Sequence, residues 1–208
     1  MIPSAPSRSF DWENSGLAVC AYGRTILNMN DNVADEQLCQ DIINEIGKVD
    51  VYFVQSASVT TFPSCFKMTD DEKNRIVRSK VENYNYQDIV INEIKPEYLI
   101  PYAGDLGWFG EQEQFNYWSR STPVELVNYI KSKGLKSCIF ESEDKFVVTT
   151  DNIKTYNNSK NNWNDYDKVI KNNSEYYSDI VKKNESRVSQ SFIPDFSSHL
   201  YNYIESIN

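Results

Sequence analysis

The sequence predicts an α/β fold, because segments with the period of a strand alternate with segments with the period of a helix. Near the amino terminus, residues 17–21 and 25–30 are two β-prone runs around Gly23, which is typical of a hairpin. A helical repeat over residues 35–46 follows, and then an apolar run at residues 51–54 that is typical of a buried strand. Strand, helix and buried strand in this order predict a βαβ unit.

The later elements are marked by capping and stop signals. A capping box at residues 69–72 opens a long helix, and its apolar stripe continues until Pro96 stops it. A strand is expected at residues 98–100, and the next helix begins at Pro123 and ends at Gly134. The last strands are expected at residues 137–140 and 145–149.

Length and charge limit the classes of function. The chain has 208 residues, of which 40% are hydrophobic, so it is long enough for one domain with a packed core. It carries 21 basic and 30 acidic residues, and the net charge of −9 disfavours binding to nucleic acid or to an anionic membrane surface. The single histidine excludes a self-contained site built on several imidazoles, as most catalytic zinc sites are.

The composition changes after about residue 150, where asparagine becomes frequent and regular apolar spacing is lost. We therefore expect residues 1–150 to form the main domain. Residues 151–208 are expected to begin as an irregular connection and to continue as helices that pack on the same domain.

Cysteine usage and hydropathy indicate a cytoplasmic protein. The four cysteines form no C-x-x-C pair, and the first residues contain no apolar run of a secretory leader. Reduced thiols are therefore expected. No run of 18 apolar residues occurs, so no membrane span is predicted.

Polar residues follow three of the expected strands, and ligands collect at the carboxyl ends of strands in α/β sheets. Asp31 follows the first of these strands and is placed to hold a metal or a polar substrate. Common capping behaviour favours another interpretation, in which Asp31 or Asn32 caps the helix that begins near Asp35.

The other two stretches supply candidates for a substrate pocket. A hydroxyl-rich loop follows residues 51–54, and a second loop follows residues 98–100. The candidates are Ser56, Ser58, Thr60, Thr61, Cys65, Tyr102 and Asp105. A catalytic Cys65 is disfavoured against a structured loop with a buried thiol, because the only histidine is the distant His199. No catalytic residue is assigned from these patterns.

Four motifs in order resemble the metallo-β-lactamase fold. Residues 22–31, which end Leu-Asn-Met-Asn-Asp, are similar to its LNxxD strand. Residues 49–63 resemble the VDxxxxxFSGASGFP region of the cytidine-monophospho-N-acetylneuraminate hydroxylase branch, and residues 95–104 resemble its KPxxxxPFAGxF region. Residues 122–126 fit the helix that follows. The resemblance covers about residues 15 to 140 and implies the carboxyl half of an αββα sandwich, with Asp31 as a metal-facing carboxylate.

The chain departs from the family where the chemistry is concentrated. The family's H-x-H-x-D-H motif belongs to the half that precedes the strand of Asp31, and it does not occur in this chain. The Rieske module of the hydroxylase needs two cysteines and two histidines, which a chain with one histidine does not supply. The family's last loop, often proline-glycine-aspartate, is here Glu-Ser-Glu-Asp at residues 141–144.

Two hypotheses of different classes follow. The first is a degenerate, inactive relative, or pseudoenzyme, that acts as a scaffold, binding module or subunit and holds no cofactor alone. The alternative is the carboxyl half of a metal-dependent hydrolase or hydroxylase for a nucleotide sugar or similar polar metabolite. A His-rich partner segment would then complete a zinc or iron site with Asp31.

Both hypotheses predict association with another chain. A half sandwich exposes the sheet face that its missing half would cover, and large apolar patches seldom stay bare. The hairpin of residues 17–30 also lies near a potential open edge of the sheet, which invites strand pairing. We therefore expect self-association, or a partner that supplies the amino-terminal half of the fold.

Overall fold

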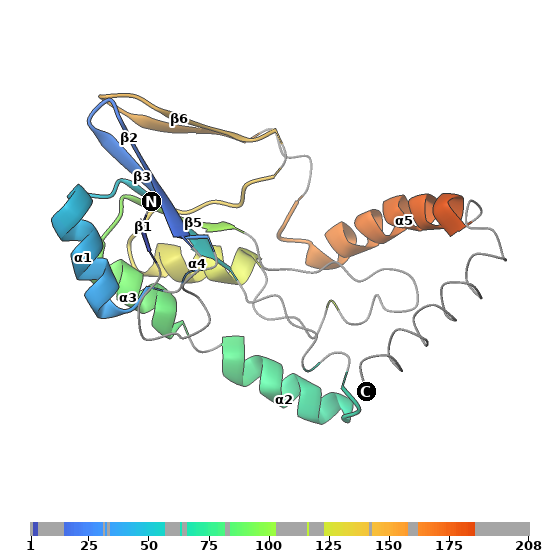
Figure 1. Ribbon diagram of the computed structural model, residues 1–208. Helices are drawn as coiled ribbons and strands as arrows, with labels where there is room; N and C mark the ends of the chain where they lie inside the picture. Colours follow the sequence, from blue (N-terminus) through green and yellow to red (C-terminus); the bar gives the residue numbers. More distant parts are fainter. Residues whose placement is uncertain are drawn as a thin grey trace, which may run out of the picture. The chain divides into compact units, whose positions relative to one another are not determined.

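The chain forms a mixed α/β structure, so the predicted class is confirmed (Figure 1). The computed structural model describes residues 2–3, 15–30, 32, 34–56, 63, 66–81, 84–102, 116, 123–141, 143–157 and 162–185. The chain divides into two compact units. The first contains Met1–Leu106 and Phe115–Asn164, and the second contains Gly107–Gln114 and Asp165–Asn208. Each unit is described by itself.

The first unit contains a mixed sheet in which the strands follow one another in chain order. The strands are β1 (Ile2–Pro3), β2 (Ser15–Ala21), β3 (Arg24–Asn28), β4 (Val51–Gln55) and β5 (Tyr98–Tyr102). The pairs β1–β2 and β2–β3 are antiparallel, whereas β3–β4 and β4–β5 are parallel. Helix α1 (Glu36–Ile46) connects β3 to β4, which confirms the predicted βαβ unit.

A two-residue turn joins β2 to β3, which confirms the predicted hairpin around Gly23. Tyr22 and Gly23 have φ of 55° and 69°, which is the left-handed region that a type I′ turn requires at both central positions. This turn matches the right-handed twist of the flanking strands. It fixes the register in which Leu17 faces Asn28 and Val19 faces Ile26.

The ends of α1 differ in part from the prediction. Gly47 ends the helix with φ of 73°, and its N–H donates to the Ile43 carbonyl at 2.9 Å. At the other end, the cap is Asp35, which accepts a hydrogen bond from the Leu38 amide at 2.8 Å. The prediction that Asp31 or Asn32 caps this helix is wrong. A capping side chain must precede the helix immediately to reach the third amide of its first turn.

The predicted long helix after residue 69 is two helices, α2 (Asp70–Val81) and α3 (Asn85–Glu93). The capping box itself is confirmed. The Glu72 amide donates to Thr69 Oγ1 at 3.3 Å, and the Thr69 amide donates to the Glu72 carboxylate at 2.9 Å. Tyr84, which precedes α3, has a non-helical ψ of 26°, so the helix is interrupted there. The regular spacing of apolar residues continues across this interruption, which is why the sequence predicts one helix.

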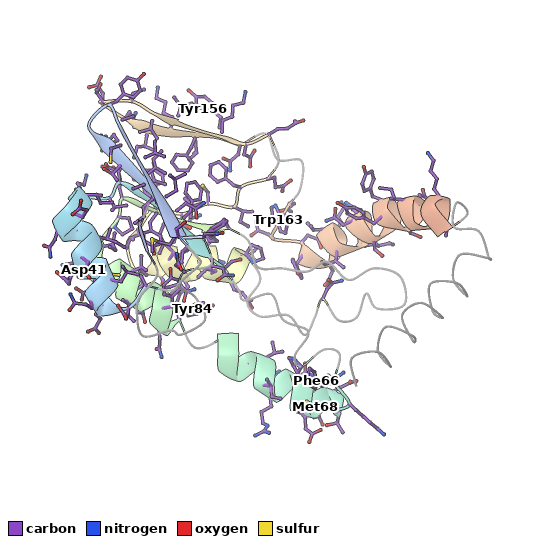
Figure 2. The ribbon with its side chains drawn as sticks, viewed as in Figure 1. Asp41, Phe66, Met68, Tyr84, Tyr156 and Trp163 are labelled. Atoms are coloured by element: carbon purple, nitrogen blue, oxygen red, sulfur yellow. The ribbon has the colours of Figure 1, made fainter. Side chains whose placement is uncertain are left out.

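One face of the sheet is covered by helices. Leu27, Tyr52 and Leu99 are fully buried side chains of β3, β4 and β5 on this face. They pack with apolar residues of α1, α3 and α4 (Pro123–Ser132), which lie together on one side of the sheet (Figure 1). The core of the helical face also explains why Tyr84, labelled in Figure 2, stacks on Tyr129 of α4 with ring centroids 3.8 Å apart.

A second core lies on the opposite face, beneath a hairpin. Val51 and Ile100 of the sheet pack there with Ile153. The hairpin consists of β6 (Lys145–Val148) and β7 (Ile153–Tyr156), which are antiparallel. Tyr156, at the exposed end of β7, is labelled in Figure 2. Strand β6 is confirmed, whereas β7 lies where the sequence predicts an irregular connection.

The strand predicted at residues 137–140 does not form. Only a single β-bridge, between Lys136 and Tyr98, forms near this segment in the described residues. It consists of two hydrogen bonds: the Leu99 amide donates to the Lys136 carbonyl at 3.0 Å, and the Lys136 amide donates to the Glu97 carbonyl at 3.3 Å. Beyond the bridge, Cys138 and Phe140 pack against the second core. Their apolar side chains therefore contribute through packing rather than through a ladder of backbone hydrogen bonds.

The second unit is described through α5 (Tyr166–Glu185), a helix of 20 residues. Val169, Ile170 and Ser174 are its buried residues, and they recur at helical spacing. Tyr176 and Tyr177 are exposed. In the part of the chain that the structure describes, no helix combines the length and the apolar character that crossing a membrane requires.

Candidate functional site

The parallel strands β3, β4 and β5 end at the same edge of the sheet, which is the edge where α/β proteins bind ligands. At this edge the Ser56 amide donates a hydrogen bond to the Tyr102 carbonyl at 3.0 Å. Gln55 and Tyr102 are also partners in the ladder. Two of the predicted pocket residues, Ser56 and Tyr102, are therefore neighbours at the start of their loops.

The Tyr102 ring belongs to the face of the sheet that carries the second core. It meets the Phe53 ring edge-on, with centroids 6.3 Å apart and planes at 88°. Phe53 packs against the second core, so Tyr102 extends that apolar surface toward the carboxyl edge. Ser56 is half-buried beside it.

The remaining predicted pocket and metal residues lie outside the described residues. They are Asp31, Ser58, Thr60, Thr61, Cys65 and Asp105. His199 lies outside as well. Within the described ranges, no three histidine, cysteine, aspartate or glutamate side chains gather closely enough to hold a metal ion. The zinc or iron site that the resemblance implies therefore has no ligand set in this part of the chain.

Asn32 is a polar residue at this edge that sequence reasoning treats only as a helix cap. Its side chain is buried, with 2% of the residue exposed, and neither its Oδ1 nor its Nδ2 has a hydrogen-bond partner among the residues that the structure describes. Its backbone is satisfied, because its N–H donates to the Met29 carbonyl at 3.0 Å and its carbonyl accepts from the Tyr86 hydroxyl at 3.4 Å. An unpartnered buried polar group costs about 1–3 kcal/mol, so a further polar group at this position would be stabilising.

The Tyr86 hydroxyl connects Asn32 to the interior of the helical face. It lies 3.1 Å from the hydroxyl of Tyr52, a fully buried side chain of β4. Burial raises the pKa of Tyr52 well above its ordinary value, and the neighbouring Tyr86 raises it further. The Tyr52 hydroxyl is therefore neutral at physiological pH and acts as a hydrogen-bonding group toward Tyr86.

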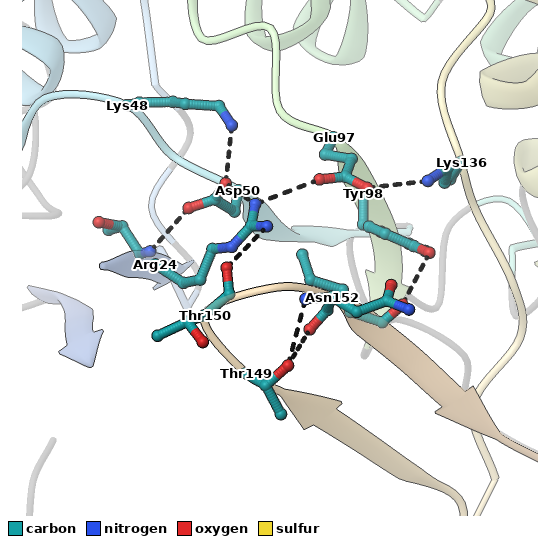
Figure 3. A network of polar contacts seen from close by, with 11 residues as sticks. Arg24, Lys48, Asp50, Glu97, Tyr98, Lys136, Thr149, Thr150 and Asn152 are labelled. Carbon is teal, nitrogen blue, oxygen red and sulfur yellow. Dashed lines mark hydrogen bonds and ion pairs between the residues drawn. The ribbon is translucent and has the colours of Figure 1, made fainter. Parts of the chain in front are cut away.

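A charged network occupies the opposite, amino-terminal edge of the same strands (Figure 3). Asp50 precedes β4, and its side chain is 3% exposed. It accepts hydrogen bonds from Arg24 Nη1 at 2.9 Å and from the Thr25 amide at 2.9 Å. Lys48 Nζ adds a third contact at 2.8 Å. Burial alone would raise the pKa of Asp50, but these hydrogen bonds outweigh it and hold the pKa below its ordinary value.

The network joins the starts of three strands. Arg24 begins β3 and also lies 3.6 Å from the Glu97 carboxylate, which precedes β5. Lys136 pairs with Glu97 at 2.8 Å. These contacts fix the register of the parallel strands at the edge remote from the predicted pocket. We assign the network to stability rather than to ligand binding.

The surface of β2 is a third feature. Leu17 and Val19 are 59% and 46% exposed, and they face Asn28 and Ile26 of β3. Because opposed residues in an antiparallel pair share a face, both side chains lie on the face that carries the second core. On its outer side, β2 pairs with β1 at Ser15 and Gly16, and no described residue pairs with the rest of that edge.

Comparisons with known proteins are sparse. No known protein family matches the chain, and no curated protein matches it. A solved structure of a mutant CmlA beta-hydroxylase is similar, with a TM-score of 0.38 and 17% sequence identity. The likeness covers 61% of this chain and 26% of that chain. It is weak.

Proposed function

We propose that this chain is a binding or assembly module that acts by docking a protein partner on β2 rather than by catalysis. It corresponds to one half of a metallo-β-lactamase-like αββα sandwich, in which a single sheet has helices on one face. The observation that carries the proposal is the exposure of Leu17 and Val19, at 59% and 46%, on the face where the second core lies.

The two parts of this face differ in their cover. Over β4 and β5, the side chains of Val51 and Ile100 are fully buried in the second core with Ile153 of β7. The side chains of Leu17 and Val19 continue the same face at β2 and remain exposed. Full burial of a leucine or valine side chain contributes about 1.5–3 kcal/mol, so a partner that covers both would gain a few kcal/mol.

The composition of β2 supports docking as well. Natural edge strands are commonly protected by lysine, proline, bulges or inward-pointing charges. The β2 sequence is Ser-Gly-Leu-Ala-Val-Cys-Ala, which contains none of these residues, although the chain as a whole has a net charge of −9. A neutral stretch without these protecting residues therefore runs along β2 of an acidic protein.

The experiment measures the native mass of the tagged chain in an extract of the cells that make it, by size exclusion with light scattering. We expect the wild type to elute above the 24.2 kDa of one chain. The double variant Leu17→Lys, Val19→Lys should elute at the mass of one chain. Val147→Lys is the matched control, because Val147 is 40% exposed on β6 and should be neutral. A wild type at the mass of one chain would refute the proposal.

A second candidate function is a polar-ligand site at the carboxyl edge, favoured by the contact of Ser56 with Tyr102 and by the unpartnered buried Asn32. In the alternative form, a His-rich partner completes a zinc- or iron-dependent hydrolase or hydroxylase for a nucleotide sugar. Titration calorimetry with Zn²⁺ or Fe²⁺, on the native assembly isolated through the tagged chain, tests its metal requirement. Binding by the wild type that Asp31→Ala removes would support this function, and equal heats would refute it.

A further inference from the structure

We propose that the β6–β7 hairpin is a displaceable flap, which opens about its base so that the protein partner of β2 covers the second core in its place. This inference rests on the proposed function and specifies how that binding is regulated. In the closed form, the hairpin occupies part of the face on which the partner docks. The hairpin is then an autoinhibitory element, because the partner must displace it to bind the whole face.

The apolar face that the hairpin covers is continuous with the exposed part of β2. Ile26 of β3 lies opposite Val19 and packs against the second core. Opposed residues share a face, so one surface runs from Val19 through Ile26 to Val51 and Ile100. Val19 is 46% exposed, whereas Val51 and Ile100 are fully buried. Ile153 of the hairpin packs on that buried part, so a partner on β2 reaches the border of the hairpin.

The hairpin has few buried contacts with the rest of the first unit. Its strands form a sheet of their own, and no described residue joins them to the five-stranded sheet through a ladder of backbone hydrogen bonds. In the four residues of β6 and the four of β7, only Ile153 is buried. Segments with few buried apolar contacts open locally at a lower free energy than the core does. The hairpin is therefore the part of this face that opens most readily.

Two long hydrogen bonds connect the hairpin to the sheet (Figure 3). Arg24 Nη2 donates to the Thr150 carbonyl at 3.4 Å. The Tyr98 hydroxyl donates to the Ile153 carbonyl, also at 3.4 Å, and both distances lie beyond the usual range for a hydrogen bond. On opening, Arg24 keeps its contact with Asp50, which its other nitrogen, Nη1, makes at 2.9 Å. Opening therefore breaks two weak bonds and leaves the charged network intact.

The hairpin keeps its shape at the tip and is held at the base, as a flap requires. At the tip, the Thr149 amide donates to the Asn152 carbonyl at 2.9 Å, and the Asn152 amide donates to Thr149 Oγ1 at 3.1 Å. At the base, the Trp163 indole, labelled in Figure 2, donates to the carboxylate of Glu141, which precedes β6. Glu143, beside this contact, has φ of 79°, a conformation that favours glycine. Such backbone strain is typical of segments that switch between two conformations.

Thiol labelling of the purified full-length chain measures opening. The half-buried Cys138 packs against the second core, and burial raises the pKa of its thiol to about 11, so the closed form reacts slowly. Tyr98→Phe removes a hydrogen bond to the hairpin and should speed Cys138 labelling about fivefold. Tyr156→Phe is the matched control on the same hairpin, because Tyr156 is 49% exposed, and it should leave the rate unchanged.

The urea dependence of labelling separates local opening from global unfolding. Opening of the hairpin exposes little surface, so the rate of Cys138 labelling should depend weakly on urea below the unfolding transition. Cys39 lies in the core of the helical face, so its labelling should depend steeply on urea. Far-UV circular dichroism of Tyr98→Phe should match that of the wild type, which shows that the variant is folded.

Hydrogen exchange tests displacement in the native assembly, isolated through the tagged chain. When the partner takes the place of the hairpin, residues 145–156 should exchange about tenfold faster than in the free chain, and residues 17–21 and 98–102 about tenfold slower. Because the partner binds the open form, Tyr98→Phe should also raise the ratio of assembled to free chain by about the factor seen in labelling. Tyr156→Phe should leave this ratio unchanged.

The outcomes distinguish this inference from the proposed function. Faster exchange of the hairpin in the assembly supports the flap. Unchanged or slower exchange there overturns it, and so does Cys138 labelling that responds to urea as Cys39 does or that Tyr98→Phe leaves unchanged. When the assembly still depends on Leu17 and Val19, the binding function then stands with the hairpin closed. When the native chain has the mass of one chain, both proposals are refuted.

Discussion

Replacing Asp50 by asparagine should destabilise the fold more than any single change at the exposed charges around it. The carboxylate is 3% exposed and accepts hydrogen bonds from Arg24 and from the Thr25 amide, both at 2.9 Å. Removing one member of a buried ion pair costs about 3–5 kcal/mol when the other charge is left uncompensated. Arg24 keeps Glu97 at 3.6 Å and its side chain is 19% exposed, so we expect about 2–4 kcal/mol.

Urea unfolding followed by far-UV circular dichroism measures this loss. Lys48→Met is the control, because the Lys48 side chain is 68% exposed and an exposed ion pair contributes about 0–1 kcal/mol. A loss below about 1 kcal/mol for Asp50→Asn would contradict the reasoning. It would mean that the asparagine amide satisfies the site as well as the carboxylate does, and that the network does not fix the strand register.

Three further predictions follow from the same structure. The depressed pKa of Asp50 means that, as pH falls, this carboxylate is protonated in the unfolded chain before it is protonated in the folded chain. Its stabilisation is therefore present above about pH 4 and is lost below it. In urea titrations from pH 7 to pH 3, the free energy of unfolding should decline less steeply for Asp50→Asn than for the wild type, and parallel curves would count against the assignment. Asp35→Ala should cost about 0.5–2 kcal/mol by removing the α1 cap, whereas an unchanged melting temperature would show that another group caps the helix. Burial raises the pKa of the Cys39 thiol to about 12, so Cys39 should resist a thiol reagent at pH 8 while the exposed Cys20 reacts. Peptide mapping of the labelled native protein would check this, and rapid labelling of Cys39 in the native protein would refute its burial.

Local patterns predict the elements of the fold that local forces determine. The hairpin follows from Gly23 between two β-prone runs, and the end of α1 follows from Gly47, because positive φ is favourable for glycine. The capping box of α2 is confirmed for a similar reason, since its donors and acceptors lie three residues apart. Such features depend on neighbours in sequence and need no knowledge of the tertiary structure.

Features that depend on distant residues are the ones that the sequence leaves undetermined. Strand β7 forms because its partner β6 and the second core stabilise it, not because residues 153–156 have a strong strand pattern. Lys136 pairs with Tyr98 across a gap in sequence that no local pattern spans. The interruption between α2 and α3 near Tyr84 likewise cannot be predicted from the sequence, because the helical spacing of apolar residues continues through it.

The candidate site divides in the same way. The strand-end rule brings Ser56 and Tyr102 together, as their hydrogen bond shows. The same rule gives no information about Asn32, whose side chain is buried without a hydrogen-bond partner among the described residues and whose carbonyl accepts from Tyr86 of α3. The periodicity and spacing of residues predict where the backbone forms strands and helices. Which buried polar side chains find hydrogen-bond partners depends on how those elements pack together.

The contact of Arg24 with the β6–β7 turn has a consequence for synthesis of the chain. Arg24 Nη2 donates to the Thr150 carbonyl at 3.4 Å, across 126 residues. Ile26, Phe53 and Ile100 precede the β6–β7 hairpin in the sequence, so they are synthesised before the hairpin that buries them. The nascent sheet therefore carries a bare apolar face until the last third of the polypeptide appears, and premature termination before residue 145 would leave that face open to aggregation.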